Sequence, residues 1–158
     1  MAMTWSGGAL DPAAHCVLAP NPGPMTLDGT NTWILCAPGA DRCVVVDPGP
    51  DDEAHLRAVL AVATGRGTRV AAILLTHGHL DHIASAAALC RAHSVPAFIH
   101  PDDDYMLDDP LTALSPELRR LLAGLPLDQL RPPEVLALTD LLEPGLAGIP
   151  ITIEASLA

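Results

Sequence analysis

The stretch Thr76-His77-Gly78-His79-Leu80-Asp81-His82 decides the fold, because it places candidate metal ligands at a fixed point of an α/β pattern. Three histidines and one aspartate fall between His77 and His82. They follow the apolar run at residues 70–75, which is typical of a buried strand. Ligands commonly bind at such strand ends in α/β sheets. The stretch therefore predicts a binding site at a strand-to-helix turn.

The side chains of this stretch suit a divalent metal. Imidazole nitrogens and carboxylate oxygens are ligands of zinc and related ions. Gly78 permits a tight loop, so the rings of His77 and His79 can converge on one ion. Asp81 and His82 start the next helix, and we expect them to hold a second ion. The predicted cofactor is Zn²⁺, two per complete site, with Fe or Mn as alternatives. A histidine-rich surface turn without metal is the competing interpretation.

The rest of the chain alternates between strand and helix patterns. Strands are expected at residues 31–36, 43–46, 70–75, 97–100 and 149–154, with a short one starting at Cys16. Helices are expected from the N-cap residues Asp51 and Asp52 to Gly65 and from His82 to about His93, with a single turn at 101–106 and a short helix capped by Ser115. This alternation predicts right-handed crossovers and an α/β sheet. Residues 1–15 are expected to form a loose N-terminal arm, and residues 16–158 one domain.

Composition and charge restrict the function classes. Apolar residues make up 49% of the 158 residues, as in a globular protein. The net charge is −11, from 8 basic and 19 acidic residues, which disfavours nucleic acid as a partner. We find no signal peptide and no apolar run of the ~18 residues that span a bilayer. A cytoplasmic protein without membrane contact is expected. Cys36 and Cys43 flank a probable hairpin and are either a disulfide or, as we expect, reduced thiols.

The central motif matches the T-H-x-H-x-D-H signature of the metallo-β-lactamase superfamily. The segment 44–49 resembles that family's strand ending in an Asp-x-Gly turn. By this resemblance Asp47 would lie behind the metal loop and hold it in place, whereas a turn-capping role is the alternative. The segment 21–32 is similar to β-lactamase-like hydrolases that include a mitochondrial endoribonuclease, and the segment 99–111 resembles actinobacterial glyoxalase II-like hydrolases. Together these resemblances imply an αββα sandwich.

The chain also departs from the family pattern. The family's site includes a later histidine in a T-P-G-H-T-like turn, a metal-bridging Asp and a final His. Residues 151–158 lie about where that turn should begin. The expectation is therefore an αββα fold truncated to its first half, with self-association through an exposed sheet face. Surface or packing roles are expected for the remaining histidines, His15, His55, His93 and His100.

Several functions follow from the resemblance. The leading hypothesis is a glyoxalase II-like, metal-dependent hydrolase that cleaves a small-molecule thioester or related ester with a metal-bound hydroxide. Asp81, besides binding metal, would take a proton as the intermediate collapses. The alternatives are a metal-binding but catalytically incomplete half-domain, a nucleic-acid-cleaving member of the superfamily, and a mononuclear iron oxygenase.

Overall fold

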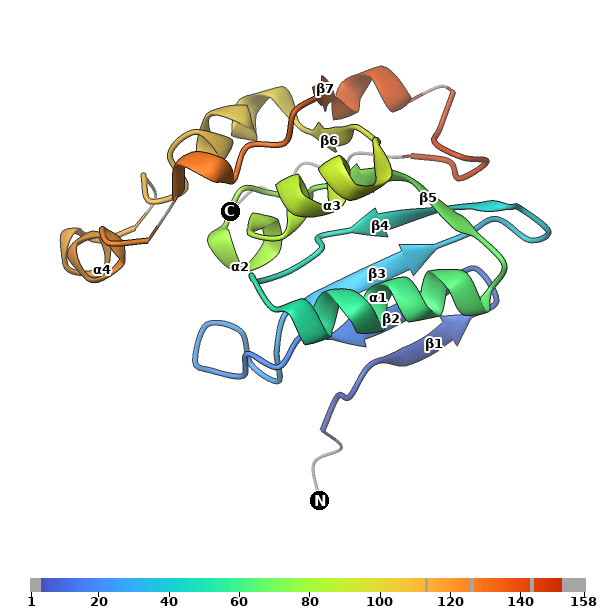
Figure 1. The fold of residues 1–158 in the computed structure, drawn as a ribbon, viewed down its shortest axis with the longest axis horizontal. Coiled ribbons are helices and arrows are strands. Elements are labelled where there is room, and N and C mark those ends of the chain that lie inside the picture. Colours follow the sequence, from blue (N-terminus) through green and yellow to red (C-terminus); the bar gives the residue numbers. More distant parts are fainter. Residues whose placement is uncertain (1–3, 113, 126, 143, 152–158) are drawn as a thin grey trace.

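A sheet of seven strands forms the centre of the part of the chain that the structure describes (Figure 1). The computed structural model describes residues 4–112, 114–125, 127–142 and 144–151. The strands lie side by side in chain order: β1 (Gly8–Asp11), β2 (Ala14–Leu18), β3 (Asn31–Leu35), β4 (Arg42–Val46), β5 (Arg69–Leu74), β6 (Ala97–Ile99) and β7 (Val135–Ala137). Strands β1 to β4 pair antiparallel, and β4 to β7 pair parallel. The α/β class predicted from the sequence is confirmed.

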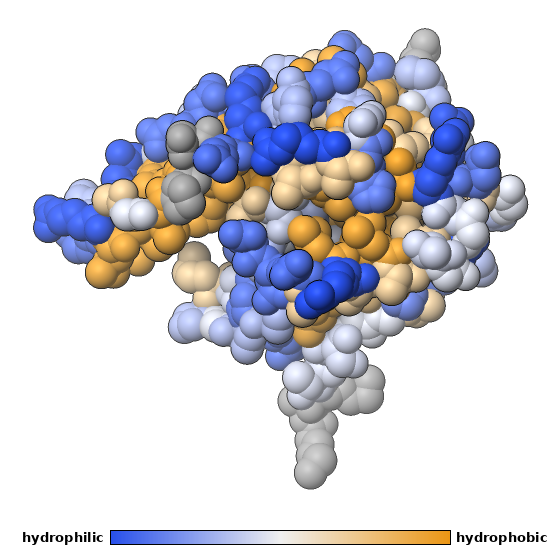
Figure 2. All heavy atoms as spheres, in the orientation of Figure 1, coloured by the Kyte–Doolittle hydropathy of each residue, from blue (hydrophilic) through white to orange (hydrophobic). Residues whose placement is uncertain are grey.

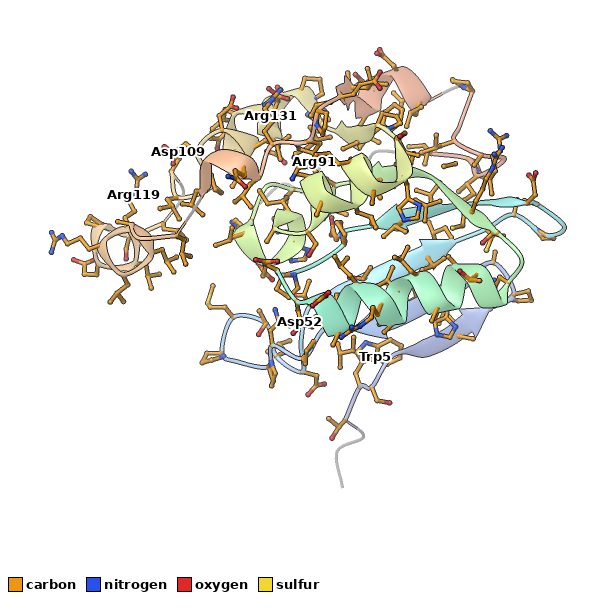
Figure 3. All side chains as sticks on the ribbon, viewed as in Figure 1. Trp5, Asp52, Arg91, Asp109, Arg119 and Arg131 are labelled. Carbon is orange, nitrogen blue, oxygen red and sulfur yellow. The ribbon has the colours of Figure 1, made fainter. Side chains whose placement is uncertain are left out.

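Helices connect the parallel strands. The longer ones are α1 (Glu53–Gly65), α3 (Ala86–His93) and α4 (Pro116–Leu122), with a single turn α2 (Leu80–Ile83) and the 3₁₀ helices η1 (Pro101–Leu107), η2 (Leu127–Gln129) and η3 (Leu138–Leu141). Helix α1 starts as predicted, because the carboxylate of Asp52 accepts the amide of His55 at 2.7 Å. Asp52 lies at the beginning of this helix in Figure 3.

The single helix expected from His82 to His93 is divided into α2 and α3, and this correction has a local cause. The amide of Ser85 donates to the carbonyl of Gly49, in the loop after β4, at 3.1 Å. The hydroxyl of Ser85 donates to the carbonyl of Pro50 at 2.6 Å. Both bonds direct Ser85 out of a continuous helical ladder and attach the helix start to the neighbouring loop.

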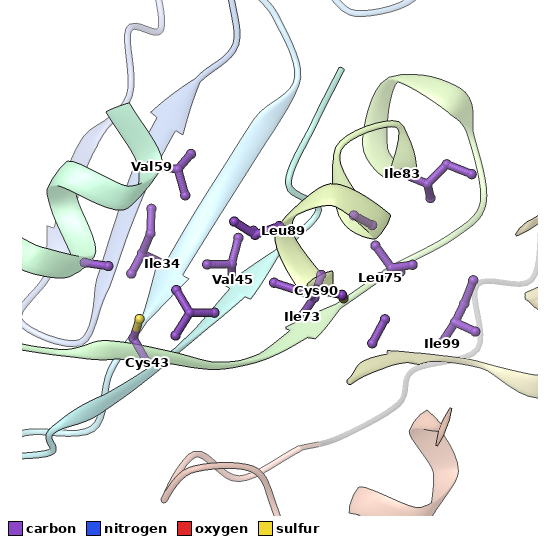
Figure 4. Packing of buried hydrophobic residues seen from close by; sticks show 14 of the residues in the cluster. Ile34, Cys43, Val45, Val59, Ile73, Leu75, Ile83, Leu89, Cys90 and Ile99 are labelled. Atoms are coloured by element: carbon purple, nitrogen blue, oxygen red, sulfur yellow. The ribbon is translucent and has the colours of Figure 1, made fainter. Parts of the chain in front are cut away.

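Side chains alternate between the two faces of the sheet. Cys43 and Val45 of β4 pack under α1 and α3, together with Ile73 of β5 (Figure 4). Val44 and Val46 point to the opposite face, where η3 contributes the buried Leu138 and Leu141. The second face is therefore covered where β4 lies, and Val44 is 1% exposed. Self-association, predicted from an exposed face, stays an untested prediction.

Three other expectations, on the N-terminal arm, the last strand and the domain boundary, can be compared with the structure. The loose arm expected over residues 1–15 is wrong in part, because β1 and β2 form an antiparallel pair there. Strand β7 was not predicted; it is three residues long and pairs with β6. The strand expected at 149–154 lies partly outside the described residues, and Ile149 makes an isolated bridge with Leu146. The assignment of residues 16–158 to one domain stays a prediction.

Two further features of the fold are the state of the cysteines and the length of the helices. The four cysteines, Cys16, Cys36, Cys43 and Cys90, are buried free thiols. Burial raises the pKa of the Cys90 thiol to about 11, so this side chain behaves as a small apolar group. Within the described ranges, the helices are all too short or too polar to span a bilayer.

Candidate metal centre

The candidate centre lies at one edge of the sheet, where parallel strands β4 and β5 end. The loop after β5 carries the histidine motif, and the loop after β4 carries Asp47. The two loops are joined by hydrogen bonds: the amide of Gly49 donates to the carbonyl of His82 at 3.1 Å, and the amide of Asp47 donates to Leu74 of β5 at 2.9 Å. Parallel strands thus bring residues far apart in the sequence to one place.

Three histidine rings meet in this loop. The ring centroids of His77 and His79 are 4.6 Å apart with the rings nearly perpendicular, and those of His77 and His82 are 4.2 Å apart. Burial lowers the pKa of His77, and the positive charge of His82 lowers it further. Both effects favour the neutral form of His77, and a neutral imidazole has an unprotonated ring nitrogen that can bind a metal.

Asp81 contacts the third ring. Its Oδ2 lies 3.2 Å from Nε2 of His82 and accepts the hydroxyl of Thr30 at 2.6 Å. The hydrogen bond with His82 lowers the pKa of the Asp81 carboxyl well below its usual range, against the effect of burial. Burial opposes the charged form of His82, but its bonds and charge interactions with Asp47 and Asp81 outweigh burial and raise its pKa to about 9.

Asp47 lies beneath the motif and is 5% exposed. Its carboxylate accepts the amide of Thr76 at 2.8 Å and the hydroxyl of Thr76 at 2.5 Å, and it lies 2.9 Å from Nδ1 of His82. The backbone of Asp47 has φ of 51°, in the left-handed region that Asp and Asn tolerate better than most residues. A proton held on Nδ1 of His82 leaves Nε2 as the metal-binding nitrogen.

The motif analysis missed three polar residues that support the centre. The side chain of Asn21 accepts the amide of Thr30 at 2.9 Å and donates to its hydroxyl at 3.0 Å. Thr32 is buried, and its hydroxyl donates to the carbonyl of Asp47 at 2.7 Å. All three belong to the segment 21–32, whose resemblance to known hydrolases was the signal that could have identified them.

Gly78 is needed because the loop passes close to η1. A Cβ added at Gly78 would lie 2.2 Å from Cβ of Met106, far inside van der Waals contact. The glycine thus allows the histidine loop to pack directly against η1. This agrees with the tight loop predicted from the sequence, although the close neighbour could not be foreseen.

The donor atoms fit a metal ion in number and kind. One ligand atom each from Asp47, His77 and His82 lie within 4.8 Å of one another. This group contains two of the four predicted ligands, with Asp47 in place of His79 and Asp81. The Asp47 carboxylate already accepts bonds from Thr76 and contacts His82. His79 and Asp81 lie on the same loop as His77 and His82 and border the cavity. We therefore interpret Asp47 as a residue that holds the metal loop in place rather than as a ligand.

Two cavities meet at this centre. A cavity of about 860 Å³ is bordered by His77, His79, Asp81 and His82, and its opposite wall is formed by the region of α4. A smaller cavity of about 350 Å³ is bordered by Asp47, Thr76, Asp81 and His82, on the side of Trp33. The candidate ligands are thus accessible to a small molecule.

The remaining histidines lie elsewhere in the fold. His15 is in β2, and His93 ends α3. His55 is buried in α1, with Nε2 2.8 Å from the hydroxyl of Thr32, and burial lowers its pKa. His100 caps η1 by accepting the amide of Asp102 at 3.2 Å.

Comparison with known proteins bears on this arrangement. The chain is 40% identical over 102 residues to an uncharacterized protein of Mycobacterium bovis. The aligned region covers 64% of this chain and 44% of that protein. It is 39% identical over 82 residues to an atrochrysone carboxyl ACP thioesterase of Aspergillus fumigatus, which covers 52% of this chain and 25% of the thioesterase. The chain thus spans less than half the length of these curated relatives.

Solved structures share the fold. A beta-lactamase domain protein from Burkholderia ambifaria superposes with a TM-score of 0.57 at 25% identity, over 84% of this chain and 44% of that chain. The metallo-beta-lactamase SMB-1 superposes with a TM-score of 0.56 at 20% identity, over 85% of this chain and 47% of that chain. A family model described as the metallo-beta-lactamase superfamily matches residues 25–154. Because this match includes the histidine loop, Asp47 and most of the sheet, the chain belongs to the metallo-β-lactamase superfamily.

Proposed function

We propose that the protein is a metal-dependent hydrolase of a small-molecule thioester or related ester. The observation that carries the proposal is the convergence of His77, His79, Asp81 and His82 at the end of β5, in a chain of this superfamily. The similarity to a protein named as an acyl-carrier thioesterase supports a thioester in particular.

The proposed ligands are His77, His79, Asp81 and His82, with zinc as the expected metal. When bound, a divalent metal would lower the pKa of water and polarise the substrate carbonyl. Asp47 would fix the tautomer and orientation of His82 and hold the loop through Thr76. Thr30 would orient the carboxylate of Asp81, and that carboxylate, ionised at neutral pH, would accept a proton during the reaction.

Metal content and thioester hydrolysis test the proposal together. Elemental analysis of the zinc-loaded chain should give up to two zinc equivalents, and a His77→Ala/His79→Ala double variant should lose them. His93→Ala is the matched control, because His93 lies at the far end of α3 and should leave zinc content unchanged. Hydrolysis of a short acyl thioester, followed by release of free thiol, should be zinc-dependent and absent in the double variant.

Two results would contradict the proposal in different ways. Equal zinc content in the chain and the double variant would remove the metal centre. Zinc binding that depends on the histidines, with no hydrolysis of any ester or thioester, would leave a metal-binding domain and reject the hydrolase.

A further inference from the structure

The larger cavity at the metal centre has two chemically different walls. One wall carries the candidate ligands His77, His79, Asp81 and His82. The opposite wall consists of leucines from the α4 region: Leu114, Leu118, Leu122, Leu125, Leu127 and Leu130. A small molecule that reaches the metal ligands therefore contacts an apolar surface at the same time.

The leucines belong to the segment from Leu114 to Leu130, the α4 arm, which stands away from the sheet (Figure 1). Helix α4 contains no buried residue, and Leu118 and Leu125 are 48% and 46% exposed. Figure 2 shows apolar residues along the side of this arm that faces the body of the molecule. Apolar side chains with so little cover among the described residues gain stability when a ligand removes them from water.

Hydrogen bonds within the arm shape its first helical turn, and an ion pair attaches its other end to η1. Ser115 caps α4 by accepting the amide of Leu118, and the guanidinium of Arg119 donates to the carbonyls of Thr112 and Leu114. At the other end, Arg131 pairs with the carboxylate of Asp104 at 3.0 Å. Figure 3 shows Arg119 on α4 and Arg131 beside η1. The Arg131–Asp104 pair thus fixes one end of the arm to η1, the element that packs against the histidine loop at Gly78.

The charges along the border of this cavity disfavour acyl groups that carry a second, anionic group. Among the described residues that border this cavity there is no Arg, and the chain has no Lys. The charged carboxylates on the border are those of Asp51 and Asp81. Away from the three histidines of the centre, an anionic end of the acyl chain would meet apolar side chains, Thr26 and the carboxylate of Asp51, whereas a neutral hydrocarbon chain would lose no ionic hydration.

We infer that this cavity binds the hydrocarbon chain of an acyl thioester or ester, and that the α4 leucines set a preference for medium-length over short acyl groups. The inference rests on the proposed hydrolase function. In the reaction, the oxygen of water bonds to the acyl carbon and the carbon–sulfur bond breaks. One proton of water goes to the thiol, and the other leaves with the carboxylic acid, which ionises.

Binding of uncharged amides tests the cavity independently of turnover. Octanamide and butanamide are titrated into the zinc-loaded chain and the metal-free chain by calorimetry or NMR. Octanamide should bind about 10- to 100-fold more tightly, because burial of each added methylene contributes favourably. The Leu118→Ser/Leu122→Ser variant should lose most of this ratio.

A matched variant separates the cavity from general effects on the helix. Leu121 lies on the same helix, is 78% exposed and is absent from the cavity lining, so Leu121→Ser should keep the octanamide ratio. Circular dichroism checks that both variants retain the helical content of the parent. An unchanged ratio in Leu118→Ser/Leu122→Ser would overturn the inference.

Turnover and assembly provide the remaining outcomes. Octanoyl and acetyl thioesters of one uncharged thiol should differ in kcat/KM in favour of octanoyl, and Leu118→Ser/Leu122→Ser should reduce that ratio. Amide binding without any turnover would reject the hydrolase but keep the apolar cavity. Light scattering that shows a dimer dissociated by Leu118→Ser/Leu122→Ser would assign the leucines to a second copy and overturn the inference.

Discussion

The side chain of Asp47 connects the fold to the candidate centre at the scale of single residues. Its carboxylate contacts Thr76 and His82, and its own carbonyl accepts the hydroxyl of Thr32. No other side chain described above holds both the start of the motif and its last histidine. Its removal should therefore disturb metal binding without removing a proposed ligand.

We predict that Asp47→Asn weakens zinc binding by about 10- to 100-fold, the usual effect of removing a group that orients a metal ligand. Asn tolerates the left-handed backbone, so the loop keeps its conformation. Competition with a chromophoric chelator measures the affinity. Asp52→Asn is the control, because Asn caps helices as well as Asp does. Equal zinc affinity in the two variants would show that Asp47 is not coupled to the metal.

The pH dependence of zinc binding follows from His82. Its pKa is raised to about 9 in the metal-free protein, and a protonated nitrogen does not bind metal. Zinc must displace this proton at neutral pH, so affinity should rise about tenfold per pH unit between pH 6.5 and 8.5 and level off near pH 9. Calorimetry in buffers of different ionisation enthalpy should detect about one proton released. Affinity that is constant over this range would be inconsistent with His82 as a ligand.

At the scale of elements, the contact between the histidine loop and η1 gives a sharp test. Gly78→Ala places a methyl group against Met106, which cannot move without shifting the backbone of η1. We expect a loss of roughly 1–3 kcal/mol in the free energy of unfolding and weaker zinc binding. Urea denaturation measures the first effect.

Gly65→Ala is the matched control for this variant. Gly65 ends α1, and an added Cβ there would meet no atom within 4 Å. Ala is also a better helix former than Gly, so stability should be unchanged or slightly higher. Destabilisation by both substitutions alike would mean that the close packing of Gly78 is not the cause.

The sequence predicted the elements whose causes are local. The N-cap at Asp52, the β-branched run of β4 and the motif at the end of β5 all lie in their expected places. The break between α2 and α3 could not be predicted, because it depends on a bond from Ser85 to Gly49 in another loop. The bond from Thr30 to Asp81 likewise joins residues 51 positions apart. The motif was thus sufficient to predict the candidate metal ligands. The residues that orient these ligands could be identified only from the fold.

For the molecule as a whole, zinc should act as a stabilising ligand. A ligand that binds only the folded state at 100 times its Kd adds about 2.7 kcal/mol to the free energy of unfolding. In a chain of this size, that raises Tm by roughly 5–10 °C. Differential scanning fluorimetry with increasing zinc measures the shift. The His77→Ala/His79→Ala variant should show little of it, and an equal shift would indicate zinc binding elsewhere.

The order of the strands has a consequence for how the protein is made. Each strand of the sheet pairs with the strand that precedes it in the chain. During synthesis from the N-terminus, each of the described strands after β1 therefore meets a neighbour that has already been made. The residues around the proposed metal site, from Asn21 to Met106, all leave the ribosome before the arm that carries α4. A nascent chain can thus complete the proposed metal site before the leucines that border the larger cavity are made.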